Sequence, residues 1–541
     1  MPRTFPVSLP SPARIRGWRL AFVVLLGTRF VGCAGALDLQ RVGAVHLDPG
    51  SHIDPIAPTR PEPSGGLFGS ESFDPAVLSP HAVLGTAVGS RLAHPHEIVA
   101  CFRRWAGESA RVQIADYATC YEGRPLVRVV ITSEANLARI DAIKSSLARL
   151  ADPRGLTDAD ADADADADAE RLAQATPLVA WLGYSIHGDE VSGADASLLV
   201  GYELAAGRGG AVESLLDNVL VIVDPVMNPD GRARMVGMVE QSRGAVGNLD
   251  YASMHRGWWP RGRGNHYLFD MNRDWFAGVA PETRGRWAAH LEWHPQLVVD
   301  AHEMGATDTY LFYPLSDPKN THISPSVFAW QHRFAAKHAE AFDARGWAYY
   351  TREWADGWYP GYTDSWASLN GSIGMLYEQA STRGQALKRP SGRVVTYAET
   401  VLAQAMSSAS DLTTLANNRV EVLRDYYRGR KETLGSKRAF VFVPGRAPDR
   451  ERDFLAAMMR QGAEVFEASD AFRARGVVAS MGGSKSHRSF PKGTYVILDG
   501  QPQGRLVRAV LGFDPRIPDD MVRREREDLE RRGRSKLYDV T

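Results

Sequence analysis

Residues 176–207 read TPLVAWLGYSIHGDEVSGADASLLVGYELAAG, and this stretch decides the fold class. The aliphatic run at 176–184 has the length of a buried strand, whereas residues 192–207 are typical of a helix. His187 and Glu190 lie in the short turn between them. The pattern therefore predicts a strand, a turn and a helix, with two chemically versatile side chains at the carboxyl end of the strand.

Three further segments also look like buried strands that end in polar residues. They are NVLVIVDPVMNPDG at 218–231, PQLVVDAHEMG at 295–305 and SIGMLYEQAS at 372–381. The chain between them is long enough for helices and long loops, and aliphatic strands that alternate with helices are typical of a parallel or mixed sheet covered on both faces. We therefore expect an α/β fold whose site lies at the carboxyl ends of the strands.

Length and charge limit the class of protein. A chain of 541 residues is too long for one ordinary core, so more than one domain is expected. Its 63 Lys and Arg residues nearly balance its 64 Asp and Glu residues, which leaves a formal net charge of −1. Because such a chain has no overall field to attract nucleic acid, we expect no nucleic-acid partner.

Residues 1–36 have the form of an export signal. Arginines precede the apolar run LAFVVLLGT at 20–28, and small residues follow it. The run is far shorter than the ~20 residues that span a bilayer. We expect an exported protein, periplasmic or extracellular. Cleavage after Ala36 would release it, whereas lipid attachment at Cys33 would tether it to a membrane. Residues 37–93, rich in Pro, Gly, Ser and His, are expected to form an N-terminal extension over the surface.

An acidic repeat, DADADADADADAE, occupies residues 158–170. Its alternation of residue types is also typical of a strand, and its carboxylates are also typical of a calcium site. However, the repeat has no glycine for a tight loop and its like charges repel one another. We therefore expect a solvated surface insertion.

Few cysteines are left once Cys33 is set aside. Only Cys101 and Cys120 remain, too few for a disulfide framework. Cys101 lies at helical spacing from apolar neighbours in a predicted helix near 94–106, so a buried thiol is expected there rather than a bridge to Cys120.

The ends of two predicted strands provide a set of metal-binding side chains. His187 and Glu190 follow the first strand, and His302 lies in the third. Two imidazoles and a carboxylate, with a fourth position open for water, are the arrangement of catalytic zinc. The H-x-x-E spacing alone more often marks a loop histidine beside a surface acid, so the assignment depends on the surrounding motifs.

Four motifs, in this order, resemble those of the zinc carboxypeptidase family, the carboxypeptidase A and B type metallopeptidases. They are NPDG at 228–231, FDMNRDW at 269–275, DAHEMG at 300–305 and GMLYEQAS at 374–381. The resemblance implies a catalytic domain over 94–435 with a mixed, mostly parallel eight-stranded sheet. It also implies one zinc ion per chain, with His187, Glu190 and His302 as the ligands.

The resemblance gives roles to two more acids. Glu378 matches the general base and acid, and Asp270 matches the carboxylate that binds the outer nitrogen of the first metal histidine. Zinc lowers the pKa of bound water towards ~7, so that a nearby carboxylate takes its proton. A carboxylate partner fixes the tautomer of the histidine. Without the other motifs, either acid would be interpreted as a solvent-facing residue.

Substrate binding is also implied by the resemblance. Asn272 and Arg273 match the pair that holds the terminal carboxylate of the substrate, and arginine suits this task because its guanidinium is planar and two-pronged. If they act in this way, the enzyme removes residues from free C-termini, and its partner is a peptide.

Two residue types remain ambiguous at this stage. An arginine should stabilise the oxyanion of the reaction, and Arg261 fits the family position better than Arg263. A tyrosine that caps the substrate is expected in GWYPGYTDSW at 357–366, where Tyr359 and Tyr362 are both candidates. Either tyrosine could instead be packed in the core.

Three acids affect the expected specificity. Asp189 stands where many relatives have a basic residue, and Glu303 directly follows His302, so both add negative charge beside the metal. Asp364 is the only acid at 360–375, where the specificity pocket is expected. Deep in that pocket it would favour Lys or Arg side chains, whereas a solvated loop acid would have no such effect.

Residues 436–541 are expected to form a second, smaller α/β domain. They resemble the class I glutamine amidotransferase-like domain that bacterial secreted relatives append. Because the chemistry of that domain needs a nucleophilic cysteine and the chain has none after Cys120, we expect a partial, non-catalytic domain with a structural or gating role.

Together these observations predict a zinc-dependent metallocarboxypeptidase with Glu378 as general base and acid. One alternative keeps the same machinery for cell-wall peptides or a non-peptide amide. Another is a non-catalytic module that binds zinc or peptide, which the presence of every ligand and of the base argues against.

Overall fold

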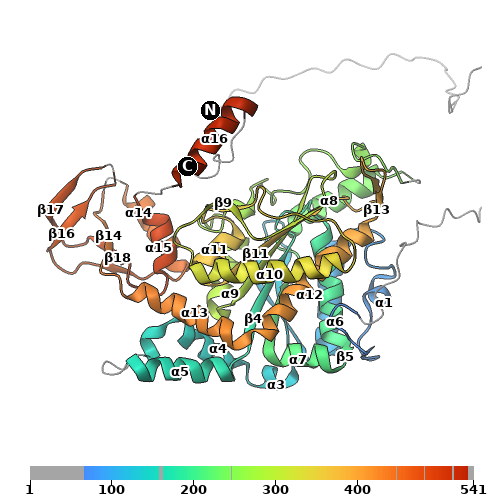
Figure 1. Cartoon of the computed structure of the whole chain (residues 1–541), viewed down its shortest axis with the longest axis horizontal. Coiled ribbons are helices and arrows are strands. Elements are labelled where there is room, and N and C mark those ends of the chain that lie inside the picture. Colours follow the sequence, from blue (N-terminus) through green and yellow to red (C-terminus); the bar gives the residue numbers. More distant parts are fainter. Residues whose placement is uncertain are drawn as a thin grey trace, which may run out of the picture. The chain divides into compact units, whose positions relative to one another are not determined.

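The central sheet is built around four parallel strands (Figure 1). In neighbour order they are β6 (Val219–Asp224), β4 (Leu178–Tyr184), β7 (Leu297–Met304) and β11 (Ile373–Ala380). These are the four strand segments predicted from the sequence, and nearly all their residues are buried. The computed structural model describes residues 66–156, 162–244, 247–445, 447–480, 482–513 and 517–533.

Antiparallel strands complete the sheet on both sides. β3 (Pro125–Ile131) pairs with β6, β2 (Val112–Thr119) with β3, and β8 (Tyr310–Phe312) with β11. The predicted mixed sheet is confirmed, but among the described residues it has seven strands where the resemblance implied eight. The next strand along the chain, β9 (Ser316–Lys319), contains Pro318, which has no N–H to donate to a ladder. It pairs only with the two-residue β10 (Asp356–Gly357).

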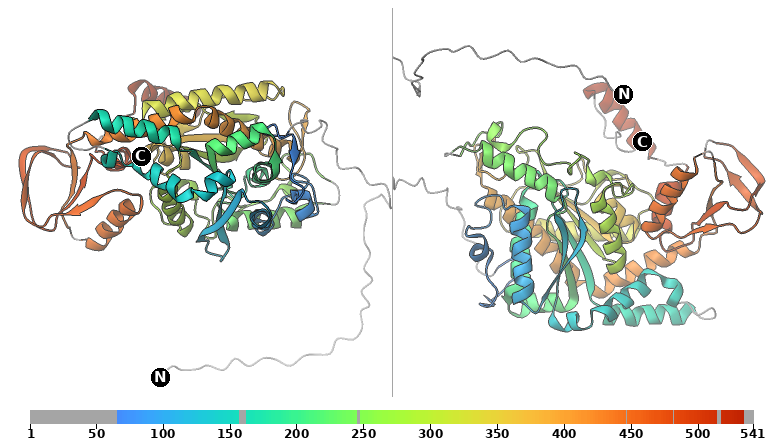
Figure 2. Two further views of the ribbon diagram at one scale, coloured as in Figure 1. Left: turned by 90° about the horizontal axis from the view of Figure 1, so that it is seen from below. Right: turned by 180° about the vertical axis from the view of Figure 1, so that it is seen from behind.

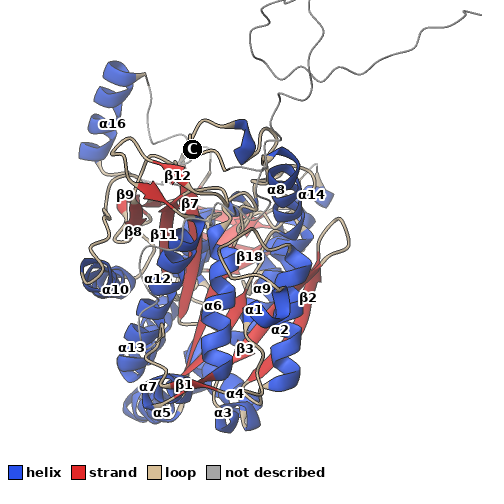
Figure 3. Ribbon diagram, turned by 90° about the vertical axis from the view of Figure 1, so that its right-hand side faces the viewer, coloured by secondary structure: helices blue, strands red, loops and turns tan. Residues whose placement is uncertain are grey.

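Helices cover both faces of this sheet, as expected (Figure 3). α6 (Ser192–Ala206) and α12 (Tyr397–Asn417) pack against each other and both contact β4 and β7. α11 (Thr363–Leu369) contacts β7 and β11, and α9 (Pro281–Trp293) contacts β2. The other helices up to residue 343 include α1 (Pro80–Leu84), α2 (Pro95–Glu108), α3 (Glu134–Ala138), α4 (Ile140–Ala151), α7 (Gly210–Asn218), α8 (Pro229–Ser242) and α10 (Pro325–Asp343).

The described part of the expected N-terminal extension, residues 66–93, is held against α6. β1 (Ser72–Phe73) pairs with β5 (Gly207–Arg208), which follows α6 directly. The carboxylate of Glu203 on α6 accepts a hydrogen bond from the backbone N–H of Phe68 at 2.9 Å. The side chain of Phe68 belongs to the main hydrophobic core, so this segment contributes to the core as well as covering the surface.

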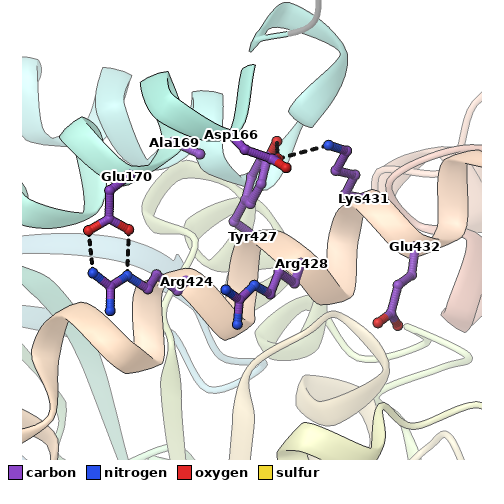
Figure 4. A pocket seen from close by; sticks show the side chains of 8 residues that line it. All are labelled: Asp166, Ala169, Glu170, Arg424, Tyr427, Arg428, Lys431 and Glu432. Carbon is purple, nitrogen blue, oxygen red and sulfur yellow. Dashed lines mark hydrogen bonds and ion pairs between the residues drawn. The ribbon is translucent and has the colours of Figure 1, made fainter. Parts of the chain in front are cut away.

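The second half of the acidic repeat forms a helix, α5 (Asp162–Ala175), packed against α13 (Arg419–Leu434), rather than the solvated insertion expected from its charge (Figure 4). In a helix, residues four apart share a face, so every second alanine lies on one side of the helix, here called the alanine face, whereas Ala167 between them is exposed. The alanine face is buried, and the acids pair with basic residues of α13. The buried alanines are Ala165, Ala169 and Ala173, and the pairs are Asp166 with Lys431 and Glu170 with Arg424.

The described residues after 436 contribute small antiparallel sheets and helices (orange to red in Figure 2), and the second α/β domain expected there stays a prediction. One sheet has the order β14 (Ala439–Phe442), β18 (Tyr495–Leu498), β15 (Val465–Glu467). The other pairs β16 (Phe472–Val478) with β17 (Ser484–Phe490). The helices are α14 (Pro448–Arg460), α15 (Gly504–Leu511) and α16 (Asp519–Arg532).

Cys101 and Cys120 are buried and unbridged, so the buried thiol expected at Cys101 is confirmed. Burial raises the pKa of the Cys101 thiol to about 12. None of the described helices combines the length and the apolar character needed to cross a membrane. The predicted export signal and Cys33 lie outside the described residues.

Candidate active site

The three predicted metal ligands meet at the carboxyl ends of β4 and β7. Each carboxylate oxygen of Glu190 faces one imidazole: Oε1 lies 2.8 Å from Nδ1 of His187, and Oε2 lies 2.8 Å from Nδ1 of His302. One ligand atom of each of the three residues lies within 4.8 Å of the others. Two buried imidazole nitrogens and one carboxylate, converging on one point, fit the donor set of a catalytic zinc ion.

Gly188 explains how the turn after β4 reaches this position. A Cβ atom on Gly188 would lie 2.1 Å from the backbone nitrogen of Arg232 at the start of α8, so no side chain fits there. The backbone N–H of Gly188 also donates a hydrogen bond to the carbonyl of Gly262 at 2.8 Å. The turn that presents His187 and Glu190 is thus held between α8 and the loop around Gly262.

Carboxylates hold the outer nitrogens of both histidines. Nε2 of His187 lies 3.0 Å from Asp270, as predicted, and Nε2 of His302 lies 2.8 Å from Asp300. Sequence reasoning missed Asp300. Its signal was the spacing D-x-H on a predicted strand, because residues two apart on a strand point to the same face.

These acids favour a cation at the centre. Burial lowers the pKa of His302, but Asp300 and Glu190 more than offset this effect and raise it well above the usual value. Burial raises the pKa of Glu190, but the two imidazoles reverse this effect and hold it below its ordinary range. The group therefore stabilises positive charge, as a metal site requires.

Glu378 stands directly beside the metal-ligand group. In the β11–β7 pairing its register partner is His302. Its side chain is only 8% exposed, and its Oε2 atom has no hydrogen-bond partner within the described part of the chain. Burial raises the pKa of Glu378. A buried carboxylate with a free oxygen beside the ligands is suited to accept a proton from water.

Arg263, not Arg261, contacts the ligand group. Its guanidinium donates to Asp270 at 2.9 and 3.1 Å and to Glu190 at 3.4 Å. Arg261 instead lies at a positive φ of 50°, and its carbonyl accepts a hydrogen bond from Arg234. The path of this irregular loop therefore directs Arg263, and not the expected Arg261, towards the ligand group, and which arginine stabilises the oxyanion stays a prediction.

Asn272 lies inside the site, and its amide contacts protein groups on both sides. Nδ2 lies 3.0 Å from Asp300 and 2.9 Å from Nε2 of His302. Oδ1 accepts hydrogen bonds from the backbone N–H and the hydroxyl of Thr363 at 2.9 and 2.7 Å. Asn272 thus connects the second metal histidine to the start of α11.

Both candidate tyrosines contact Arg273. Its guanidinium lies 4.6 Å from the centre of the Tyr362 ring, a cation–π distance. The Tyr359 hydroxyl donates a hydrogen bond to the Arg273 carbonyl at 3.1 Å. The structure therefore brings Arg273, Tyr359 and Tyr362 together.

The zinc carboxypeptidase family model matches residues 101–375, which is half of the chain and includes all three ligands. The chain belongs to the zinc carboxypeptidase family.

Solved structures in this family's fold are similar at low identity. The metallo-carboxypeptidase of Burkholderia cenocepacia is 14% identical, with 59% of this chain and 68% of that chain covered and a TM-score of 0.38. Carboxypeptidase A of Helicoverpa armigera is 16% identical, with coverage of 63% and 78% and a TM-score of 0.40. The metallo-carboxypeptidase of Pseudomonas aeruginosa is 15% identical, with coverage of 61% and 70% and a TM-score of 0.40. No curated protein matches the chain.

Two of the three acids that were expected to affect specificity, Glu303 and Asp364, are buried and bonded within the protein. Glu303 accepts hydrogen bonds from the backbone N–H of Ser192 at 2.9 Å and from the Ser381 hydroxyl at 2.6 Å, so it caps the start of α6. Asp364 is buried and accepts a hydrogen bond from Tyr313, which excludes the solvated alternative. Burial, aided by repulsion from Asp300, raises the pKa of Asp364 to about 7.

Proposed function

We propose that this member of the zinc carboxypeptidase family hydrolyses the C-terminal peptide bond of peptides. The main support is one arrangement: the buried group of His187, Glu190 and His302 with Glu378 beside it in register. When bound by these three ligands, zinc supplies a Lewis acid that polarises the scissile carbonyl and activates water.

The protein's own residues prepare the ligands. Asp270 and Asp300 accept hydrogen bonds from Nε2 of the two imidazoles, so that each ring turns Nδ1 towards Glu190 and would offer its lone pair there to zinc once the ion replaces the Nδ1 protons. Because Asp300 is completely buried, the His302 ring has little freedom to rotate. The ligands are therefore held in one geometry before a metal ion binds.

Proton transfer falls to Glu378. Its unpartnered oxygen takes the proton of the attacking water, and the raised pKa lets the carboxyl group keep that proton until the leaving amine accepts it. Arg263, with its side chain 46% exposed beside Glu190, supplies positive charge where the oxyanion forms.

Arg273 selects substrates that have a free C-terminus. With Asn272 beside it, the guanidinium binds the terminal carboxylate of the substrate, and Tyr359 and Tyr362 enclose the bound residue. Asn272 supports this pocket through Thr363 and His302, so the charge comes from Arg273 alone.

The remaining parts of the chain support an exported enzyme. We propose that residues 1–36 direct export to the periplasm or the outside, with release after Ala36 or a lipid anchor at Cys33. The unit after 436 is proposed to be a non-catalytic relative of the amidotransferase-like domains, because no cysteine follows Cys120.

Zinc analysis of the mature protein, combined with hydrolysis of a mixed peptide library, tests the proposal. We expect one zinc ion per chain and loss of single C-terminal residues that a chelator abolishes. Glu378→Gln should keep the metal and lose turnover by roughly 100-fold or more. Zinc bound without peptide cleavage would reject the peptidase function, and cell-wall fragments would then be the next substrates to test.

A further inference from the structure

One buried glutamine of the C-terminal segment (residues 436–541) bonds two strand-connecting segments of the catalytic part. Gln461 follows α14 directly and is completely buried. Its Oε1 accepts a hydrogen bond from the indole N–H of Trp366 at 2.8 Å. Its Nε2 donates to the carbonyl of Phe276 at 3.0 Å. The same side chain thus ties together two segments about 90 residues apart in sequence.

Both segments belong to the candidate substrate pocket. Phe276 follows Arg273 by three residues. Trp366 lies on α11, whose first residue, Thr363, holds the amide of Asn272. A line of hydrogen bonds therefore runs from Gln461 through α11 to Asn272, which contacts the metal-ligand histidine.

Apolar packing follows the same route. The rings of Trp366 and Trp275 lie 5.0 Å apart. Both belong to one buried cluster with Met271, which precedes Asn272, with Ile186, which precedes His187, and with Leu506 of α15. The C-terminal segment thus forms one side of the cluster on which the pocket and the first metal ligand rest.

We propose that the C-terminal segment supports the substrate pocket and that Gln461 is its positioning residue. Without the amide, the buried Trp366 Nε1 would lose its partner and the partly buried Phe276 carbonyl would lose a hydrogen bond, which disfavours the closed arrangement of the two segments. Arg273 and α11 would then separate more often, and the pocket for the terminal carboxylate would loosen. This inference rests on the proposed function.

The test uses Gln461→Met in the full, zinc-loaded chain. Methionine keeps the length of the side chain and removes its hydrogen bonds to Trp366 and Phe276, together with the one to the Ala457 carbonyl within the C-terminal segment. Amide hydrogen exchange in residues 271–276 and 363–369 should accelerate, and KM for peptides should rise roughly five- to tenfold with kcat little changed. Trp366→Phe, which removes the indole N–H and also leaves a smaller ring, should likewise accelerate exchange and raise KM, and serves if the methionine variant does not fold.

Gln501→Met is the matched control. Gln501 is also completely buried in the C-terminal segment, but its side chain bonds the backbone of Glu464 and Leu498 within that segment. It should leave exchange at 363–369 and KM unchanged. Wild-type exchange in the Gln461 and Trp366 variants, or equal effects from Gln501→Met, would overturn the proposal. If the protein hydrolyses no peptide at all, the proposed function is rejected. The hydrogen-exchange data still show whether Gln461 couples the C-terminal segment to residues 271–276 and 363–369.

Discussion

Replacing Asp300 by asparagine should weaken zinc binding about tenfold while the protein stays folded. Asp300 is completely buried and lies 2.8 Å from Nε2 of His302, so no water replaces the lost charge. The variant keeps the shape of the side chain but exchanges a charge-assisted hydrogen bond for a neutral one. That exchange costs about 1–2 kcal/mol, which corresponds to roughly 5- to 30-fold in the dissociation constant.

The assay is competition between the metal-free protein and a chelator for zinc, with a thermal melt to confirm folding. Asp364→Asn is the matched control, because Asp364 is equally buried nearby but bonds Tyr313 instead of a metal ligand. It should bind zinc like the wild type. Asp270→Asn should have a smaller effect than Asp300→Asn, because Asp270 is 26% exposed and shared with Arg263. Wild-type zinc affinity in a folded Asp300→Asn protein would refute the reasoning.

Three further outcomes are expected. Arg273→Met should lower kcat/KM by about 30-fold or more for peptides with a free C-terminus, and a substrate with an amidated C-terminus should not distinguish the variant from the wild type. Arg424→Met, like high salt, should speed cleavage of α5 by a protease specific for acidic residues, because the pairing with Glu170 is lost; unchanged cleavage would contradict the role of that pair. The Arg91 guanidinium lowers the pKa of Glu97 from 4.5 to about 2, so Glu97 stabilises the fold above pH 4.5 and loses this effect as the pH falls through 2. Glu97→Gln should therefore lower the free energy of unfolding by about 1 kcal/mol at pH 7 and leave it unchanged at pH 2, as urea titrations at both pH values would measure.

The pattern of residues within a short segment was sufficient to predict the structural features that depend on that segment alone. The aliphatic runs predicted β4, β6, β7 and β11, the polar residues at their ends predicted His187, Glu190 and His302, and the family resemblance added Glu378. Parallel strands end at the same edge of a sheet, so side chains from distant segments meet there without any special contact. The helix formed by the acidic repeat was not predicted, because its acids pair with basic residues of α13, which begins about 250 residues later in the chain.

The sequence by itself determined the α/β class, the family and the grouping of His187, Glu190 and His302, because these depend on strand periodicity and on short motifs that resemble those of the zinc carboxypeptidases. Only the tertiary structure decided that Arg263 rather than Arg261 faces Glu190, that Asp300 holds His302, and that Gln461 reaches Trp366. These contacts depend on the path of loops and on the packing of segments far apart in the chain. No local pattern encodes them, since the same residues could face solvent if the neighbouring segment were absent.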